Sequence, residues 1–380
     1  MTIWEHFRKG FRDNVRQYTM VLALVAIWLI MTWLTQGVFI SPRNISNLFL
    51  QTVVVAIVAL GMTLIIVTGN IDLSVGSVAG FTGAVAAVLQ VKYGWGTAGA
   101  LAAAAGAGLL IGGWHGFWVA YRKVPAFIVT LASMLAFRGA ILGVTGGSTV
   151  SPLAGSFKAI GTNYLSPHAS GALGVVAVVV FVFWSLRQRA RRVEYGFPVP
   201  PMGVEAAGVA ARAAVLAAVF AVMVFNQGVP YSVLLLLGLA LVFGFMAEDT
   251  VFGRRLYAIG GNPEAARLSG INIERNGLYL FMIFGVLTAI AGCVLTARLN
   301  AATTSAGVNM ELDAIAACVI GGTSLLGGEG TIVGALIGAL IMSSLDNGMS
   351  LMNLDITYQY VVKGMILLLA VWVDMANRRK

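Results

Sequence analysis

Long apolar blocks separated by short polar segments run along almost the whole chain. Each block holds roughly 17–22 residues, the length that an α-helix needs to cross a hydrocarbon core of about 30 Å. The candidate spans are residues 19–36, 47–67, 73–90, 97–120, 126–144, 170–186, 211–226, 230–246, 277–297, 310–326, 330–346 and 357–374. We therefore predict an all-α, polytopic helical membrane protein with about 10–12 transmembrane spans. Residues 19–376 are expected to form a single membrane domain.

The block at 310–326 is the weakest of these candidate spans. It is short, begins with Glu311 and Asp313, and ends in the sequence GGTSLLGG. A broken or re-entrant helix is tolerated at membrane depth where protein or a water-filled cavity surrounds it. We expect such a broken helix here.

The first 18 residues have a different pattern. Apolar and basic side chains fall on two separate faces of a helix over residues 4–18. The apolar face holds Trp4, Phe7, Phe11 and Val15, and the basic face holds Arg8, Arg12 and Arg16. This pattern predicts an interfacial helix over residues 1–18, lying on the cytoplasmic leaflet.

Composition and charge agree with a membrane location. Only 10% of the residues are charged, whereas a soluble domain carries about 25%. The net charge of +9 would suit nucleic acid, but most Lys and Arg residues fall in segments that lie on one side when the N-terminus is cytoplasmic. The positive-inside rule explains this bias. We expect a membrane protein with both termini in the cytoplasm, in contact with the lipid bilayer and with no nucleic-acid partner.

Motifs for enzymatic or cofactor chemistry are missing. The chain has no GxxxxGK[ST] phosphate loop, no zinc-type Cys or His spacing, and no recognisable catalytic triad or carboxylate pair. Cys293 and Cys318 lie in apolar segments without a CxxC pattern. We expect no enzyme activity, no metal, no disulfide and no cofactor bound by this chain.

The polar loop at 247–276 contains the most informative local signals. Asn262 suits a helix cap, Pro263 suits the first helical position, and Gly270 suits the position after the last turn. These residues predict a short exposed helix that carries Glu264, Ala265 and Ala266. By itself, this pattern fits a docking helix for a cytoplasmic partner and a solvated loop helix equally well.

The Glu-Ala-Ala…Gly pattern is similar to the coupling loop of ABC importer permeases. Four longer stretches resemble the ribose/xylose/galactose class of these permeases: GMTLIIVTGNIDLSVGS (61–77), GGNPEAARLSGIN (260–272), ELDAIAACVIGGTSLLGG (311–328) and SLDNGMS (344–350). The resemblance implies a permease that works with a cytoplasmic ABC ATPase, a periplasmic sugar-binding protein and a second permease copy. ATP and Mg²⁺ would be used by the ATPase subunit, and the permease would lie in the bacterial inner membrane. The implied coupling residues are Asn262, Pro263, Glu264, Ala265, Ala266 and Gly270.

Within this class, the stretch at 118–139 and the extra spans around 170–226 resemble the permeases for D-xylose. D-xylose is therefore the expected sugar, with ribose, galactose or several monosaccharides as alternatives. Residues 153–170 and 187–212 carry no recognisable pattern. An ion-coupled secondary transporter and an intramembrane enzyme acting on lipid-linked sugars are more distant alternatives.

Ionisable residues inside apolar segments are costly and are often functional. Asp72, Arg138, Asp313, Asp346 and Lys363 are such residues. The candidate lining of a hydrated sugar path is Asn70, Asp72, Ser74, Asp313, Asp346 and Asn347. The competing interpretation is that these residues pair with one another for structural reasons.

Overall fold

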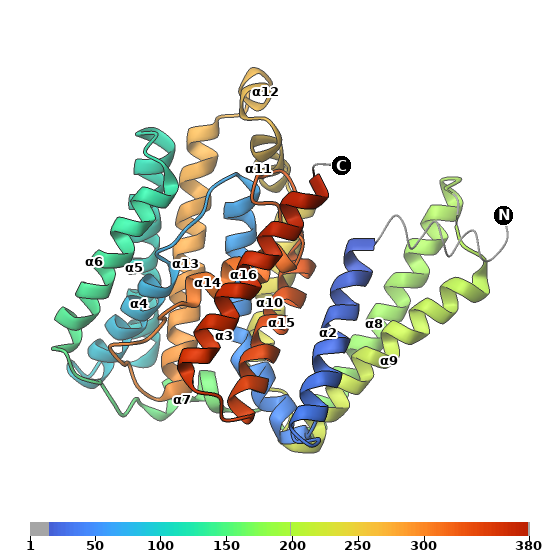
Figure 1. Cartoon of the computed structure of the whole chain (residues 1–380), viewed down its shortest axis with the longest axis horizontal. Helices are drawn as coiled ribbons and strands as arrows, with labels where there is room; N and C mark the ends of the chain where they lie inside the picture. Colours follow the sequence, from blue (N-terminus) through green and yellow to red (C-terminus); the bar gives the residue numbers. More distant parts are fainter. Residues whose placement is uncertain (1–14, 198, 379–380) are drawn as a thin grey trace.

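The computed structural model of the chain describes residues 15–197 and 199–378, which fold into a bundle of helices (Figure 1). In chain order the helices are α2 (Val15–Leu34), α3 (Pro42–Val67), α4 (Val75–Val91), α5 (Thr97–Gly116) with the π-helical turn η1 (Phe117–Tyr121), α6 (Ala126–Thr145), α7 (Gly155–Thr162), α8 (Pro167–Glu194), α9 (Met202–Asn226), α10 (Tyr231–Glu248), α11 (Val251–Gly261), α12 (Pro263–Leu268), α13 (Ile273–Leu299), α14 (Met310–Ile320), α15 (Ile332–Leu351) and α16 (Ile356–Arg378). The predicted all-α class is confirmed.

Nine helices in the described part of the chain are long and apolar enough to cross a membrane. Two shorter apolar helices, at Thr19–Leu34 and Val75–Val91, add to these. The segment predicted as a span at 310–326 forms helix only to Ile320. Its 11 residues extend about 16 Å, about half of a hydrocarbon core. The predicted broken helix is therefore confirmed, and a count of twelve complete crossings is too high.

Helix α3 occupies the centre of the bundle. Its sequence is apolar on every side, which is typical of a helix with no solvent- or lipid-facing surface, and nearly all of its residues are buried. It begins at Pro42, where the Ser41 side chain accepts a hydrogen bond from the Asn44 amide. It packs against α9, α10, α13, α14 and α15, so most of the core forms around this one helix.

Close helix contacts depend on glycine. Gly108 on α5 and Gly285 on α13 each face the other's backbone carbonyl, and neither position has room for a Cβ atom. Gly334 and Gly338 on α15 contact the carbonyls of Gly321 and Ala317 in the same way. Small residues at helix interfaces let membrane helices approach closely, which explains why glycine occupies these positions of α5, α13 and α15.

Two irregular segments precede short helices inside the bundle. Residues 68–74 lead into α4, and residues 300–309 lead into α14. The two helix starts meet where Gly76 contacts the Gly307 carbonyl. The Arg138 guanidinium on α6 donates a hydrogen bond of 2.9 Å to the Ala306 carbonyl. These non-helical segments are thus enclosed by protein, and one of their backbone carbonyls accepts a hydrogen bond from an arginine, as irregular backbone inside a membrane domain requires.

The predicted limits of the spans around α8 and α9 need correction. The segment between the predicted spans 170–186 and 211–226 is largely helical, because α8 continues to Glu194 and α9 begins at Met202. An ion pair between Arg189 and Glu205 joins the two extended helices. The interfacial helix predicted over 1–18 lies mainly outside the described residues and stays a prediction. Its last residues, from Val15, belong to the first turn of α2.

The helices place their ends on two opposite faces. In Figure 1, α12, the turn between α8 and α9, and the end of α16 lie on one face, and α7 lies on the other. Helices α2, α8 and α9 stand along one side of the bundle (Figure 1). The arrangement separates the polar loop at 247–276 from the connections on the opposite face.

Candidate functional site

The start of α12 is fixed by its own sequence. The Asn262 side-chain oxygen accepts hydrogen bonds of 3.0 Å from the backbone amides of Glu264 and Ala265. Pro263 occupies the first helical position, where no donor is needed. The predicted helix start is confirmed, and the predicted coupling role of these residues stays a prediction.

The end of α12 is a Schellman motif. The Gly270 amide donates to the Arg267 carbonyl and the Ile271 amide donates to the Ala266 carbonyl, the two bonds that define this motif. Gly270 has a φ of +82°, a conformation that glycine adopts without strain. Ala266 faces inward, whereas Leu268 is 88% exposed. The helix therefore presents a short, rigid surface at one end of the molecule (Figure 1).

The base of this loop contacts the membrane helices directly. The Tyr257 hydroxyl on α11 donates a 2.8 Å hydrogen bond to the Gly330 carbonyl, two residues before α15. Burial, followed by the nearby Glu248 carboxylate, raises the pKa of Tyr257, so the hydroxyl keeps its proton. Gly260 packs on the Val67 carbonyl at the end of α3. A displacement of α11 would act on α3 and α15 together.

A second contact joins α12 to the start of α13. The Glu274 carboxylate accepts from Arg267 at 2.9 Å and from Lys123 at 2.7 Å. Lys123 follows η1, so this carboxylate links three segments on the same face. These groups are partly exposed to solvent, and exposed ion pairs contribute at most about 1 kcal/mol. They orient the loop more than they stabilise the fold.

The predicted path residues Asp72 and Ser74 lie together in the break before α4. Both are buried, and the Asp72 carboxylate accepts from the Ser74 amide at 2.8 Å and from its hydroxyl at 2.6 Å. The other Asp72 oxygen lies 3.7 Å from His115 Nδ1 on α5. Asn70 is apart from this cluster and donates to the Thr68 hydroxyl at 3.0 Å.

Asp313 and Asp346 form a second cluster around a lysine. Lys363 Nζ on α16 lies 3.0 Å from an Asp313 oxygen on α14 and 2.7 Å from an Asp346 oxygen on α15. Asn347, although adjacent to Asp346, faces the other way. It exchanges side-chain hydrogen bonds of 2.8 and 3.1 Å with Asn44 on α3.

The six predicted path residues therefore do not line one site. Most of them form hydrogen bonds or ion pairs with neighbouring side chains. Their role in transport stays a prediction.

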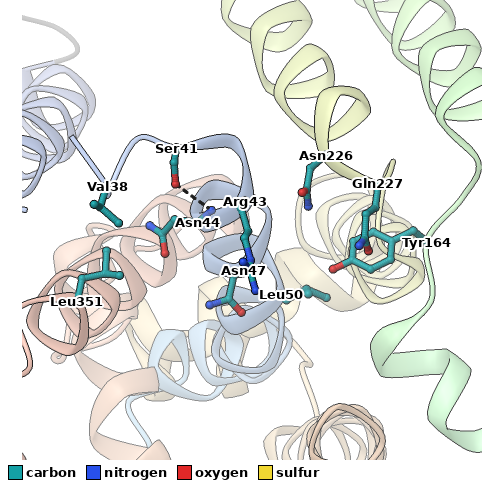
Figure 2. A pocket seen from close by; sticks show the side chains of 10 residues that line it. All are labelled: Val38, Ser41, Arg43, Asn44, Asn47, Leu50, Tyr164, Asn226, Gln227 and Leu351. Carbon is teal, nitrogen blue, oxygen red and sulfur yellow. Dashed lines mark hydrogen bonds between the residues drawn. The ribbon is translucent and has the colours of Figure 1, made fainter.

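A polar cavity that the sequence did not indicate (Figure 2) lies among helix ends on the face opposite α12 (Figure 1). It has a volume of about 630 Å³ and is lined by Val38, Ser41, Arg43, Asn44, Asn47, Leu50, Tyr164, Asn226, Gln227 and Leu351. We call it the distal cavity. Asn47 and Asn226 stand at the limits of two predicted spans. Side-chain amides at the ends of apolar blocks were the only sequence feature that pointed to a polar cavity there.

Comparison with known proteins places the chain in a family. Residues 44–371 match the family described as branched-chain amino acid transport system / permease component. The chain belongs to this permease family. It is a multi-pass membrane subunit of a transport system, as the resemblance in its sequence implied.

Several similar permeases share nearly the whole chain. The xylose transport system permease protein XylH of Escherichia coli K12 is 50% identical over 97% of this chain and 93% of its own length. The Haemophilus influenzae protein of the same name is 47% identical over 97% and 98%. The ribose import permease protein RbsC of E. coli K12 is 37% identical over 97% and 96%. No solved structure matches the chain.

Proposed function

We propose that this permease is the membrane subunit of an ATP-driven importer that passes D-xylose from a periplasmic binding protein to the cytoplasm. The higher identity to two xylose permeases than to a ribose permease supports the choice of sugar. Ribose, galactose or a mixture of monosaccharides is the alternative within the same mechanism. The permease itself binds no nucleotide, and ATP with Mg²⁺ is used by the partner ATPase.

The observation that carries this proposal is the construction of α12. A six-residue helix has little apolar surface to bury, yet both of its ends are capped and its outer side chains are exposed. An isolated helix of this length is not stable in water. Its caps hold it ready for a partner, and we assign that partner as a cytoplasmic ABC ATPase. Asn262, Pro263, Glu264, Ala265, Ala266 and Gly270 form the docking segment.

Coupling then follows from the contacts at the base of the loop. Closure of the ATPase pair would push on α12, and α11 would pass the displacement to α3 and α15 through Gly260 and Tyr257. Tightly packed glycine contacts resist compression, so the helices would move as rigid bodies. Two permease copies would open the path alternately to each side. In this arrangement the α12 face, including both chain termini, is cytoplasmic.

The experiment is a charge reversal on the docking segment. Glu264→Arg should lower ATP-driven uptake of D-xylose by more than about tenfold, because a like charge or lost contact at a docking surface weakens association by 1.4 kcal/mol or more. Glu194→Arg, an exposed reversal at the end of α8, is the matched control and should transport normally. Both variants are tested for co-purification with the ATPase.

The outcomes separate the possible functions. Uptake at the wild-type rate by Glu264→Arg would show that α12 is not the coupling element. Xylose uptake by the purified chain without ATP, stopped by a proton ionophore, would make the protein a secondary transporter instead.

A further inference from the structure

The distal cavity is formed by helix ends and their connections, all on the face opposite α12. Its lining comes from residues 38–50 at the start of α3, from Tyr164 before α8, from Asn226 and Gln227 at the end of α9, and from Leu351 at the end of α15. In the orientation proposed above, this face is the periplasmic one. A sugar released by the binding protein would meet this surface first.

Several polar side chains in the cavity have no partner within the described chain. Arg43 and Asn47 project from α3, and Asn226, Gln227 and Tyr164 stand across from them (Figure 2). Among the described residues, none forms a hydrogen bond with these five side chains. Their donors and acceptors are free for a ligand.

The first wall of the cavity is rigid. The side-chain amide nitrogen of Asn44 donates hydrogen bonds of 2.8 Å to the Phe39 carbonyl and of 2.8 Å to the side-chain oxygen of Asn347. Asn347 returns a bond of 3.1 Å. This exchange fastens the start of α3 to α15 and so holds the helical turn that carries Arg43 and Asn47.

The second wall is held by an antiparallel bridge. The Leu165 amide donates to the Val229 carbonyl at 2.8 Å, and the Tyr231 amide donates to the Asn163 carbonyl at 3.0 Å. The Ser170 hydroxyl accepts from the Val229 amide at 2.9 Å. The segments that carry Tyr164, Asn226 and Gln227 are therefore preorganised, which lowers the entropic cost of ligand binding.

We propose that the distal cavity receives a neutral monosaccharide before translocation. This deepens the proposed function, on which it rests, by naming a sugar site. Among the described residues that line the cavity there is no carboxylate and a single cation, so a neutral ligand fits it. Side-chain amides both donate and accept, as sugar hydroxyls do, and Val38, Leu50 and Leu351 offer apolar contact for the C–H groups. The volume falls within the range of small-molecule sites, about 300–1,000 Å³.

Another ligand chemistry competes for the same cavity. The Arg43 guanidinium is suited to a phosphate, and a lipid headgroup at the edge of the bilayer would supply one. The amides that surround Arg43 favour the sugar, because a phosphate presents acceptors only and would leave the acceptor oxygens of Asn47, Asn226 and Gln227 unpaired.

Thiol labelling tests this assignment directly. The native thiols Cys293 and Cys318 are 5% and 0% exposed, so an introduced cysteine is the reactive one. Asn47→Cys and Gln227→Cys are placed in the cavity. Tyr93→Cys, on an exposed turn between α4 and α5, is the control on the same face. A charged, membrane-impermeant methanethiosulfonate is added to right-side-out vesicles that contain the complete importer and ATP.

We expect D-xylose with its binding protein to slow labelling of both cavity cysteines several-fold and to leave Tyr93→Cys unchanged. A labelling rate of the cavity cysteines that does not change at any xylose concentration would overturn the proposal. Protection by short-chain phosphatidylglycerol instead of xylose would assign the cavity to a lipid headgroup. Uptake of xylose by the wild-type importer in the same vesicles tests the proposed function separately. Failure of the proposed function can therefore be distinguished from failure of the proposed sugar site.

Transport kinetics give a second measurement. Asn47→Leu combined with Gln227→Leu should raise the KM for binding-protein-delivered xylose about tenfold, the effect of losing two hydrogen bonds. Asn47→Gln retains the amide and should recover part of that loss. An unchanged KM in the double variant, with normal insertion of the protein, would contradict a sugar site here.

Discussion

Removal of Lys363 should destabilise the helix bundle, because this residue is paired with two carboxylates. Its ammonium lies between Asp313 at 3.0 Å and Asp346 at 2.7 Å, and it joins α14, α15 and α16. Lys363→Met keeps the apolar stem but leaves two carboxylates close together without a cation. Removing one partner of a buried ion pair costs about 3–5 kcal/mol. The Lys363 side chain is 17% exposed, so solvent screening places the expected loss near the lower limit.

The assay compares heat-induced loss of the monodisperse protein in detergent for three proteins. These are the wild type, Lys363→Met, and a triple variant that adds Asp313→Asn and Asp346→Asn. The single variant should lose its folded peak at a clearly lower temperature, and the triple variant should recover most of the difference because its carboxylates are gone. Equal midpoints for the wild type and Lys363→Met would refute the reasoning. A triple variant less stable than the single one would do the same.

Two further predictions concern local geometry. Gly108→Val should reduce the folded yield, because it drives a side chain into the Gly285 carbonyl and overpacking costs about 1–3 kcal/mol. Gly106→Val on the same helix has nothing within 4 Å and should have a normal yield in the same size-exclusion assay. Asn262→Ala removes the cap of α12, worth about 1 kcal/mol, and should weaken co-purification with the ATPase while the protein inserts normally. Wild-type retention of the ATPase by this variant would mean that docking does not require the capped helix.

The sequence predicted α12 well because every signal that defines it is local. The Asn262 cap, the proline at the first position and the left-handed Gly270 act within one turn of the residues they organise. Such preferences are set by backbone sterics and neighbouring amides. Distant parts of the fold are not needed to place this helix.

The sequence identified the polar residues inside the bundle, but it did not identify which of them contact one another. Asp313 and Lys363 are 50 residues apart, and Asn44 and Asn347 are 303 apart. Hydropathy marks an ionisable residue as costly in a membrane, but it does not say which helix lies opposite. The distal cavity was missed for the same reason, because its walls come from four separate connections. The length of α8 was misjudged because its last turns are too polar to resemble a span.

Helix α15 relates these separate features to one another. It starts just after Gly330, whose carbonyl holds Tyr257 of α11, and its 20 residues extend about 30 Å to the opposite face. Near its far end, adjacent residues contact different neighbours: Asp346 pairs with Lys363 of α16, and Asn347 pairs with Asn44 beside the distal cavity. In the mechanism proposed here, a push on α12 that displaces α11 would therefore reach the ion pair and the cavity wall through a single rigid helix. The two clusters would respond together, since no flexible segment separates Asp346 from Asn347.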